Sequence, residues 1–161
     1  MTDAAAFTIR AATPADLDDV RALFREYHGW LALDLCFQGF EAELAALPGR
    51  YAPPSGRLYV GEVHGALAGC IALREIEPGV CEMKRLYLRE TARGLGLGRA
   101  LAERVVADAR EIGYACMRLD TIRDRMRAAN AIYESLGFRD IPAYYPNPHG
   151  DVRYMELDLR A

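Results

Sequence analysis

The sequence predicts a mixed α/β fold in one domain that spans residues 1–161. Ranges with alternating apolar residues, typical of strands, occur between ranges in which apolar residues recur every three or four positions, typical of helices. With 161 residues and 52% hydrophobic content, the chain is long enough to bury a substantial core. A strand–helix–strand unit over residues 80–121 predicts a right-handed crossover, which makes its two strands parallel neighbours.

The first half of the chain is predicted to hold a strand, two helices and a hairpin. After a strand at residues 7–10, Thr13-Pro14 supplies an N-cap followed by proline, a pattern typical of a helix start. Helical spacing then follows at Leu17, Val20, Leu23, Phe24 and Tyr27. We expect a second helix over 40–47, which Pro48-Gly49 ends, and strands over 58–63 and 66–74 around a His64-Gly65 turn.

The second half continues the alternation. Pro78-Gly79 predicts a turn before a strand at 80–88, and a helix from about residue 98 to 112 ends at Gly113. A strand at 115–121, a helix at 126–136 that ends at Gly137, and strands at 138–145 and 152–159 complete the chain. The predicted order is therefore β-α-α-β-β-β-α-β-α-β-β.

Composition excludes several classes of protein. A net charge of −3 and a pI near 5.6 give no basic field, so we expect neither nucleic-acid nor membrane partners. The widely spaced Cys36, Cys70, Cys81 and Cys116, together with three scattered histidines, indicate no disulfide framework and no metal site. No apolar run approaches the roughly 20 residues that span a bilayer, and no signal pattern precedes the domain, so a cytoplasmic location is expected.

A glycine-rich loop, Arg93-Gly94-Leu95-Gly96-Leu97-Gly98-Arg99, lies between a predicted strand and a predicted helix. Glycine permits positive φ and close backbone approach, and a helix N-terminus offers unpaired N–H groups and a dipole that favour phosphate. The loop lacks the Lys-Ser/Thr pair of a P-loop, since Arg99-Ala100 follows Gly98. It also fails G-x-G-x-x-G, because the sixth position is occupied by Arg99 or Leu101.

The loop does fit Arg-x-x-Gly-x-Gly through Arg93, Gly96 and Gly98, and Asn130 with Tyr133 follows on a later helix. In this arrangement the chain resembles the GNAT N-acetyltransferase superfamily over essentially its whole length. The resemblance implies a GNAT-like fold, with a mostly antiparallel central sheet and a splayed parallel strand pair at the acetyl-CoA cleft.

The resemblance also implies that acetyl-CoA is the donor substrate. Backbone N–H groups from Arg93 to Ala100 would hold its pyrophosphate, and the pantetheine arm would lie along Leu86-Tyr87-Leu88, where the amide nearest Leu86 polarises the thioester carbonyl. The expected donor-binding residues are Leu86, Tyr87, Leu88, Arg93, Gly94, Leu95, Gly96, Leu97, Gly98, Arg99 and Asn130. The alternative for the two arginines is that they are ordinary solvated charges.

Two residues are predicted to move protons. Glu82, on the strand before the loop, is the candidate general base, acting directly or through water, because an amine must lose a proton before it attacks. Its alternative roles are a salt bridge to Lys84 or Arg85, or an exposed strand position. Tyr133 is the candidate general acid for the departing thiolate, and its alternative role is that of a core aromatic.

The acceptor site is expected to involve the first two helices and the last hairpin. The candidate residues are Tyr27, Trp30, Arg85 and Tyr144, with Asp34, Phe37, Tyr145 and Asn147 as further contacts, although the aromatic ones are equally compatible with a core position. We expect an acyltransferase that moves acetyl directly to a primary amine of a small-molecule or amino-acid-like acceptor, as a monomer or homodimer. The alternatives are a non-catalytic acyl-CoA-binding module and an acetyltransferase of protein N-termini or lysines.

Overall fold

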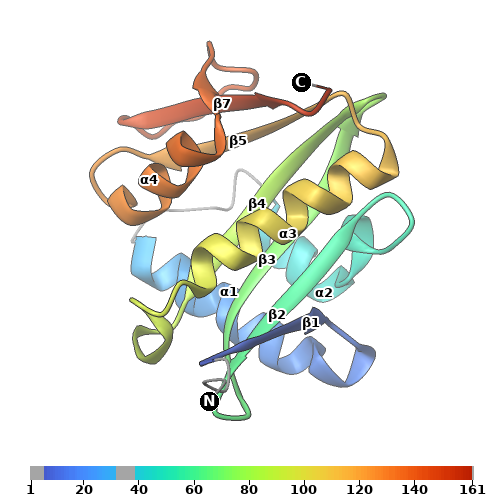
Figure 1. Cartoon of the computed structure of the whole chain (residues 1–161), viewed down its shortest axis with the longest axis vertical. Coiled ribbons are helices and arrows are strands. Elements are labelled where there is room, and N and C mark those ends of the chain that lie inside the picture. The colour runs from blue at the N-terminus through green and yellow to red at the C-terminus, as the bar shows by residue number, and fades with distance from the viewer. Residues whose placement is uncertain (1–5, 32–38, 161) are drawn as a thin grey trace, which may run out of the picture.

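A seven-stranded sheet separates two layers of helices (Figure 1). The computed structural model describes residues 6–31 and 39–160, so the predicted contacts Asp34 and Phe37, and also Cys36, lie outside the described residues. The strands are β1 (Thr8–Ala11), β2 (Arg57–Val63), β3 (Ala66–Glu77), β4 (Val80–Leu88), β5 (Cys116–Ile122), β6 (Arg139–Asp140) and β7 (Val152–Asp158). The α-helices are α1 (Leu17–Leu31), α2 (Phe40–Ala46), α3 (Leu97–Ile112) and α4 (Arg127–Leu136). The predicted element order is confirmed.

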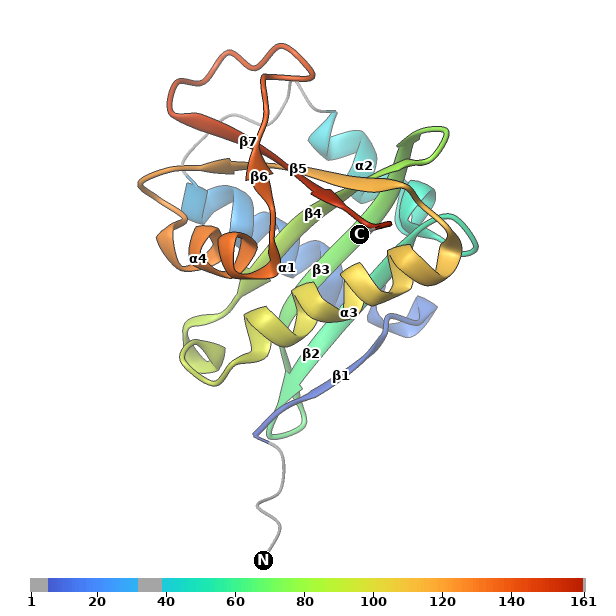
Figure 2. The ribbon, with the colours of Figure 1, turned by 45° about the horizontal axis from the view of Figure 1, so that its top comes forward.

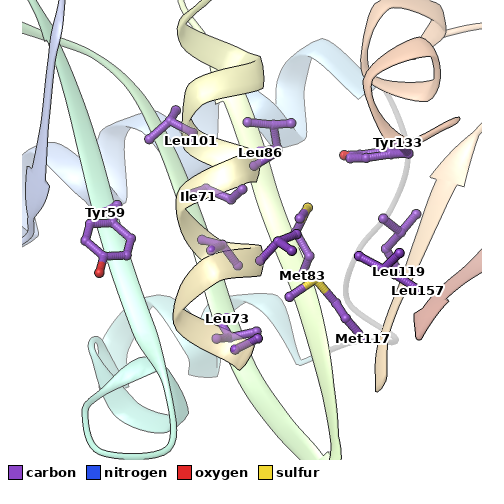
Figure 3. Close-up of a cluster of buried hydrophobic side chains, with 14 of the residues drawn as sticks. Tyr59, Ile71, Leu73, Met83, Leu86, Leu101, Met117, Leu119, Tyr133 and Leu157 are labelled. Atoms are coloured by element: carbon purple, nitrogen blue, oxygen red, sulfur yellow. The ribbon is translucent and has the colours of Figure 1, made fainter. Parts of the chain in front are cut away.

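The helices cover both faces of the sheet, with α1 and α2 on one side and α3 and α4 on the other. Figure 2 shows the same layers in a second view. On one face Leu97, Leu101 and Val105 of α3 are fully buried in a core shared with the sheet (Figure 3). On the other face Leu23 and Phe24 of α1 are fully buried in a second core. None of the described helices is long and apolar enough to cross a membrane.

The sheet is antiparallel except at its centre, as predicted. Its strand order is β1-β2-β3-β4-β5-β7-β6, and only β4 and β5 run parallel. These two strands are paired at Val80↔Cys116, Cys81↔Met117 and Glu82↔Arg118, and no pairing follows although β4 continues to Leu88. The sheet is therefore split beyond Glu82, and backbone groups along the end of β4 are left without a β5 partner.

A β-bulge interrupts β4 inside this split. Cys70 pairs with Tyr87 and Ala72 pairs with Lys84, so two steps along β3 match three steps along β4. Arg85 has the positive φ of 62° that accompanies the extra residue. The bulge breaks the alternation of side chains, and Lys84 and Arg85 consequently lie on the same face, toward α2.

One predicted strand is wrong in its extent. The range 138–145 was expected to be a strand, but β6 contains only Arg139–Asp140, and one further bond joins the Ile141 N–H to the Tyr154 carbonyl. Pro142 follows and has no N–H to donate, so pairing ends there. The chain beyond it leaves the sheet edge and carries Tyr144 toward β4.

Helix α2 is joined to the bulge by a buried ion pair. Arg85 donates from Nε and Nη2 to the two carboxylate oxygens of Glu43, at 2.9 and 3.1 Å. The Arg85 side chain is 3% exposed and that of Glu43 is 14% exposed. Burial is the largest single influence and would raise the pKa of Glu43, but the hydrogen bonds and charge of Arg85, together with the charge of Lys84, outweigh it, and the pKa is lowered.

Replacing Glu43 should therefore destabilise the fold. We expect Glu43→Gln to lower the free energy of unfolding by roughly 3–5 kcal/mol at neutral pH, because it leaves the Arg85 charge buried and unpaired. Since the folded-state pKa of Glu43 is lowered, its contribution is complete above the ordinary glutamate pKa of about 4.3 and is lost as the pH falls through the folded-state value. Urea unfolding between neutral and acid pH would measure both effects.

The matched control lies on the same helix. Glu41 pairs with Arg25 at 3.6 Å, and both side chains are well exposed, so Glu41→Gln should change stability by less than about 1 kcal/mol. Equal effects of the two substitutions would contradict a special role for the buried pair.

Gly56 allows a close approach between two backbone segments. A Cβ at this position would lie 2.7 Å from the Cα of Tyr51 and closer still to the Arg50 carbonyl oxygen. Gly56→Ala should therefore cost about 1–3 kcal/mol through overpacking against backbone, measured by denaturant unfolding. Gly29→Ala is the control, because nothing lies within 4 Å of its Cβ position in α1 and about 0.5–1 kcal/mol of stabilisation is expected there. A harmless Gly56→Ala variant would refute the close approach.

Candidate functional site

A pocket with a volume of about 250 Å³ lies where β4, α3 and α4 meet. We call it the β4–α4 pocket; its lining comprises Trp30, Leu86, Tyr87, Leu88, Arg93, Gly98, Arg125, Met126, Ala128, Ala129 and Ile132. Its walls are mostly apolar, and its two cationic side chains, Arg93 and Arg125, belong to segments just outside β4 and β5. Five of the predicted donor-binding residues, Leu86, Tyr87, Leu88, Arg93 and Gly98, are brought together here.

The glycine loop forms the N-terminal end of α3. Gly94 and Gly96 have φ values of +81° and +86°, a conformation that side-chain-bearing residues seldom adopt. The first helical bond of α3 joins the Ala100 N–H to the Gly96 carbonyl, so the amides of Leu97, Gly98 and Arg99 precede it. These amides and the helix dipole provide an anion site beside the pocket.

The remaining loop residues have different surroundings. Gly98 is needed for packing, because a Cβ there would lie 3.3 Å from Leu88 and 3.5 Å from Ile132. Leu97 is fully buried in the core, whereas Leu95 is 41% exposed at the outer side of the loop.

The arginines near the loop divide into two groups. The guanidinium of Arg93 lies 5.8 Å from the centre of the Trp30 ring, and Arg125 donates to the Trp30 carbonyl oxygen at 2.9 and 3.1 Å. Arg99 is directed elsewhere, with an ion pair to Glu103 at 2.9 Å and a hydrogen bond to Ser135 Oγ at 2.5 Å. Arg125 was missed by sequence reasoning, since it lies in a loop of alternating charges that carries no recognisable motif.

Helix α4 contributes Asn130 and Tyr133. Asn130 is 7% exposed, and its Nδ2 donates at 3.2 Å to the carbonyl oxygens of Ile122 and of Arg123, at the end of β5. Its Oδ1 is buried and has no hydrogen-bond partner among the described residues. Tyr133 packs its ring against Phe138, and its hydroxyl is directed toward β4 near Leu86 (Figure 3). Burial raises the pKa of Tyr133, so the phenol keeps its proton.

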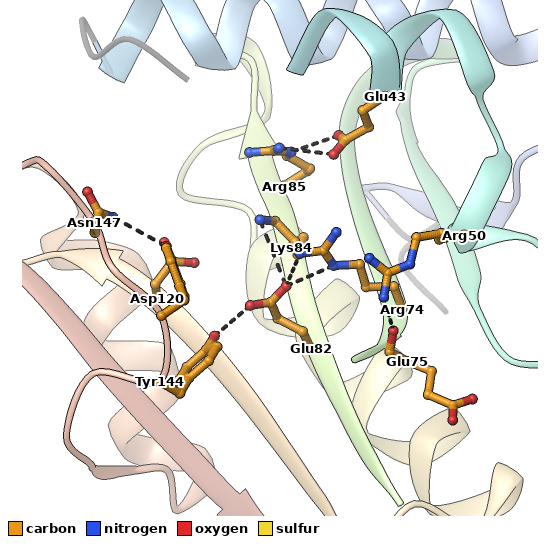
Figure 4. A network of polar contacts seen from close by, with 11 residues as sticks. Glu43, Arg50, Arg74, Glu75, Glu82, Lys84, Arg85, Asp120, Tyr144 and Asn147 are labelled. Atoms are coloured by element: carbon orange, nitrogen blue, oxygen red, sulfur yellow. Dashed lines mark hydrogen bonds and ion pairs between the residues drawn. The ribbon is translucent and has the colours of Figure 1, made fainter. Parts of the chain in front are cut away.

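Glu82 is the centre of a polar network on the other face of the split (Figure 4). It is 1% exposed, and its Oε1 accepts a hydrogen bond from Arg74 Nε at 2.9 Å and forms an ion pair with Arg74 Nη2 at 2.8 Å. Lys84 Nζ lies 3.8 Å from the same oxygen, and burial is the main cause that lowers the pKa of Lys84. Tyr144 donates its hydroxyl to Oε2 at 2.6 Å. The predicted bridge to Lys84 is therefore present, and Arg74 is the closer partner.

A second tyrosine extends the network to β5. Tyr145 donates to Asp120 and packs edge-on against Tyr144, with ring centres 5.3 Å apart. Asn147 donates to the Tyr145 hydroxyl at 3.3 Å. Two tyrosines that follow β6 thus bind carboxylates on β4 and β5, the two strands that separate.

The other predicted acceptor residues lie apart from Glu82. Tyr27 is buried beside Tyr87, with ring centres 6.0 Å apart, and Trp30 lines the β4–α4 pocket. Arg85, predicted as an acceptor residue, is instead bound to the carboxylate of Glu43. Sequence reasoning missed Arg74, which lies directly opposite Glu82 in the hairpin around Pro78-Gly79. Pairing the two predicted strands about that turn would have identified it.

No group of three or more potential metal ligands was found among residues 6–31 and 39–160.

Comparisons with known proteins agree with this geometry. An uncharacterized N-acetyltransferase of Schizosaccharomyces pombe is 41% identical over 148 residues, which cover 91% of this chain and 90% of that protein. The N-acetylaspartate synthetase of Danio rerio is 32% identical over 101 residues, 62% of this chain and 36% of the synthetase. An acetyltransferase structure from Salmonella typhimurium with its cofactor acetyl-CoA superposes with a TM-score of 0.72 at 23% identity, covering 96% of this chain and 94% of that one.

The match to a family model extends over most of the chain. Residues 17–138 match the model of the acetyltransferase (GNAT) family, and this range contains the glycine loop, Glu82, Asn130 and Tyr133. GNAT members are acyltransferases that use acetyl-CoA. The chain belongs to the GNAT family of acetyltransferases.

Proposed function

We propose that this protein transfers the acetyl group of acetyl-CoA directly to the primary amine of a small, amino-acid-like acceptor. The observation that carries the proposal is the split between β4 and β5. On one face it borders the β4–α4 pocket, and on the other it begins at Glu82, the last paired residue of β4. A thioester held in the pocket would therefore meet an amine that approaches from the Glu82 side.

The residues around the pocket fit the donor. Gly94 and Gly96 leave the loop open, and the amides of residues 97–99 match a pyrophosphate at a helix N-terminus. Arg93 and Arg125 supply positive charge at the pocket, whereas Arg99 is held by Glu103 and Ser135. Leu86 and Ile132 provide apolar walls for a pantetheine arm, and the free edge of β4 offers it backbone partners. The Nδ2 of Asn130 is already bonded to backbone carbonyls, so its Oδ1 would accept a hydrogen bond from the donor.

Glu82 is suited to receive the proton that the amine must lose. In the transfer, the ammonium first gives one proton to Glu82, directly or through water. The neutral nitrogen then forms a bond to the acetyl carbon, the carbon–sulfur bond breaks, and the second proton on nitrogen passes to the departing sulfur, which leaves as the thiol. Arg74 and Tyr144 hold the two carboxylate oxygens, so the group is fixed in position. The backbone amide nearest Leu86 would polarise the thioester carbonyl.

Tyr133 is proposed to act on the departing sulfur. Because burial raises its pKa, the phenol is a stable hydrogen-bond donor at neutral pH. A thiolate with the ordinary thiol pKa of about 8.5 is a weaker base than the Tyr133 phenolate, so stabilisation of the sulfur by hydrogen bonding is favoured over full ionisation of Tyr133. This refines its predicted role as a general acid.

Two observations support the proposal of a small, amino-acid-like acceptor: the restricted space around Glu82 and the name of a similar protein. The polar groups around Glu82 are buried or half-buried, which suits a small molecule. The N-acetylaspartate synthetase that resembles part of this chain bears the name of an N-acetylated amino acid. The direct test is thiol release from acetyl-CoA with a panel of free amino acids, polyamines and peptides. Binding of acetyl-CoA without turnover on any member would refute the proposed reaction.

Removing the carboxylate of Glu82 should abolish most of the turnover. We expect Glu82→Gln to lower kcat by about 10²–10⁴ while the affinity for acetyl-CoA, measured by calorimetry, stays unchanged. Glu62→Gln is the control, because Glu62 pairs with Arg10 on β1 and β2, away from the split. A Glu82→Gln enzyme with wild-type kcat would exclude Glu82 as the base.

Removing the hydroxyl of Tyr133 should also reduce kcat and spare donor binding. We expect Tyr133→Phe to lower kcat by about 10²-fold or more, with its thermal stability close to that of the wild type. Tyr114→Phe serves as the control, since the Tyr114 hydroxyl donates to the Ser55 carbonyl at the opposite end of the sheet. Parallel losses of kcat and of acetyl-CoA affinity in Tyr133→Phe would indicate a packing role instead.

A further inference from the structure

A second pocket, with a volume of about 320 Å³, lies beneath α2. We call it the α2 pocket; its polar side chains are Glu43, Arg50, Tyr51 and Arg74. It adjoins the proposed catalytic base, because Arg74 both lines this pocket and holds Oε1 of Glu82. Nothing in the donor site uses this cavity.

The hydroxyl of Tyr51 is the first sign of a ligand here. Tyr51 is 2% exposed, and its buried oxygen makes no hydrogen bond within normal distance among the described residues. Burial is the main cause that raises the pKa of the Tyr51 phenol, and the nearby Glu43 carboxylate contributes to raising it. Its ring packs edge-on against Phe24 with centres 6.4 Å apart, a contact that phenylalanine would make equally well. A buried hydroxyl without a partner is unfavourable, so its presence in a pocket wall favours an incoming acceptor atom.

The charges of the pocket are the second sign. The guanidinium groups of Arg50 and Arg74 and the carboxylate of Glu43 line the pocket, while Glu82 and Arg85, the partners of Arg74 and Glu43, lie outside its lining. Arg85 already binds both carboxylate oxygens of Glu43. Arg50 donates one hydrogen bond to the backbone carbonyl of Glu75 at 2.5 Å, and it forms no ion pair with a carboxylate among the described residues. Figure 4 shows the carboxylate of Glu75 pointing away from Arg50. Positive charge is therefore in excess beside Tyr51, which favours an anion.

We propose that the α2 pocket binds the carboxylate of the acceptor through Arg50, Tyr51 and Arg74, and so selects amines that carry a carboxylate. This inference rests on the proposed acetyl transfer. In an α-amino acid the ammonium and carboxylate groups are neighbours. A carboxylate held at Arg74 therefore places the ammonium next to Glu82, the partner of Arg74. The site is complementary to both charges of a zwitterion.

Paired acceptors test this selectivity. The rate of thiol release from acetyl-CoA is measured for glycine, L-alanine and L-aspartate and for their α-amides, which keep the amine and lose the α-carboxylate charge. We expect kcat/KM to favour the acids by about tenfold or more, as for a hydrogen bond to a charged group. Equal values for acids and amides would overturn the proposal, while acetylation of either kind would leave the proposed reaction standing.

Two substitutions then locate the selectivity. Tyr51→Phe and Arg50→Gln should each raise KM for the acids by about tenfold and leave the amides unaffected. Tyr59→Phe and Arg104→Gln are the matched controls, since both residues contact Asp108 on the opposite face of the sheet. Because Arg50 is exposed, Arg50→Gln keeps the test valid if Tyr51→Phe fails to fold. Unchanged selectivity in both variants would overturn the assignment.

A binding measurement separates the two proposals. Calorimetry of the same acids and amides with the CoA-saturated protein requires no turnover. Tighter binding of the acids, lost in Arg50→Gln, would support the α2 pocket even if no amine were acetylated and the proposed reaction had failed. Equal binding of acids and amides would overturn the pocket assignment.

Discussion

The separation of β4 from β5 is the constraint on which the other features of the site depend. Parallel pairing stops at Glu82 and Arg118, and every later backbone group on that edge of β4 lacks a strand partner. Such groups are available to bond to a ligand, and the apolar β4–α4 pocket lies beside them. Several interstrand hydrogen bonds are therefore missing at the centre of the sheet, where parallel strands are ordinarily fully paired and buried.

The bulge at Arg85 compensates for part of this loss. By placing two consecutive cationic residues on one face, it permits the buried pair with Glu43 and leaves Lys84 beside Glu82. Helix α2 is thereby fixed against the sheet, and the α2 pocket is formed between them. Tyr144 and Tyr145 complete the arrangement from the other side by bonding to Glu82 and Asp120. The proposed acceptor side thus involves strands on both sides of the split.

Much of the fold, and the grouping of residues at the proposed donor site, could be predicted from the sequence because their signals are local. Helical and strand periods gave the element order, and glycines at positive φ beside a helix start gave the anion site. The acceptor side could not be predicted in the same way. Arg85 faces α2 because one extra residue shifts the alternation of side chains along β4. Tyr144 reaches Glu82 because Pro142 ends the pairing of β6. Tyr51 lies in a separate short 3-10 helix, Gly49–Tyr51. These positions are set by tertiary contacts between distant segments.

Amide hydrogen exchange with and without acetyl-CoA is the most direct test of the central claim, that the split edge of β4 and the start of α3 form the donor site. The account predicts slower exchange on binding in residues 83–88 and 94–100, with the β1–β2 edge of the sheet unchanged. Protection that left both of those ranges unaltered, or that appeared only elsewhere in the sheet, would contradict it.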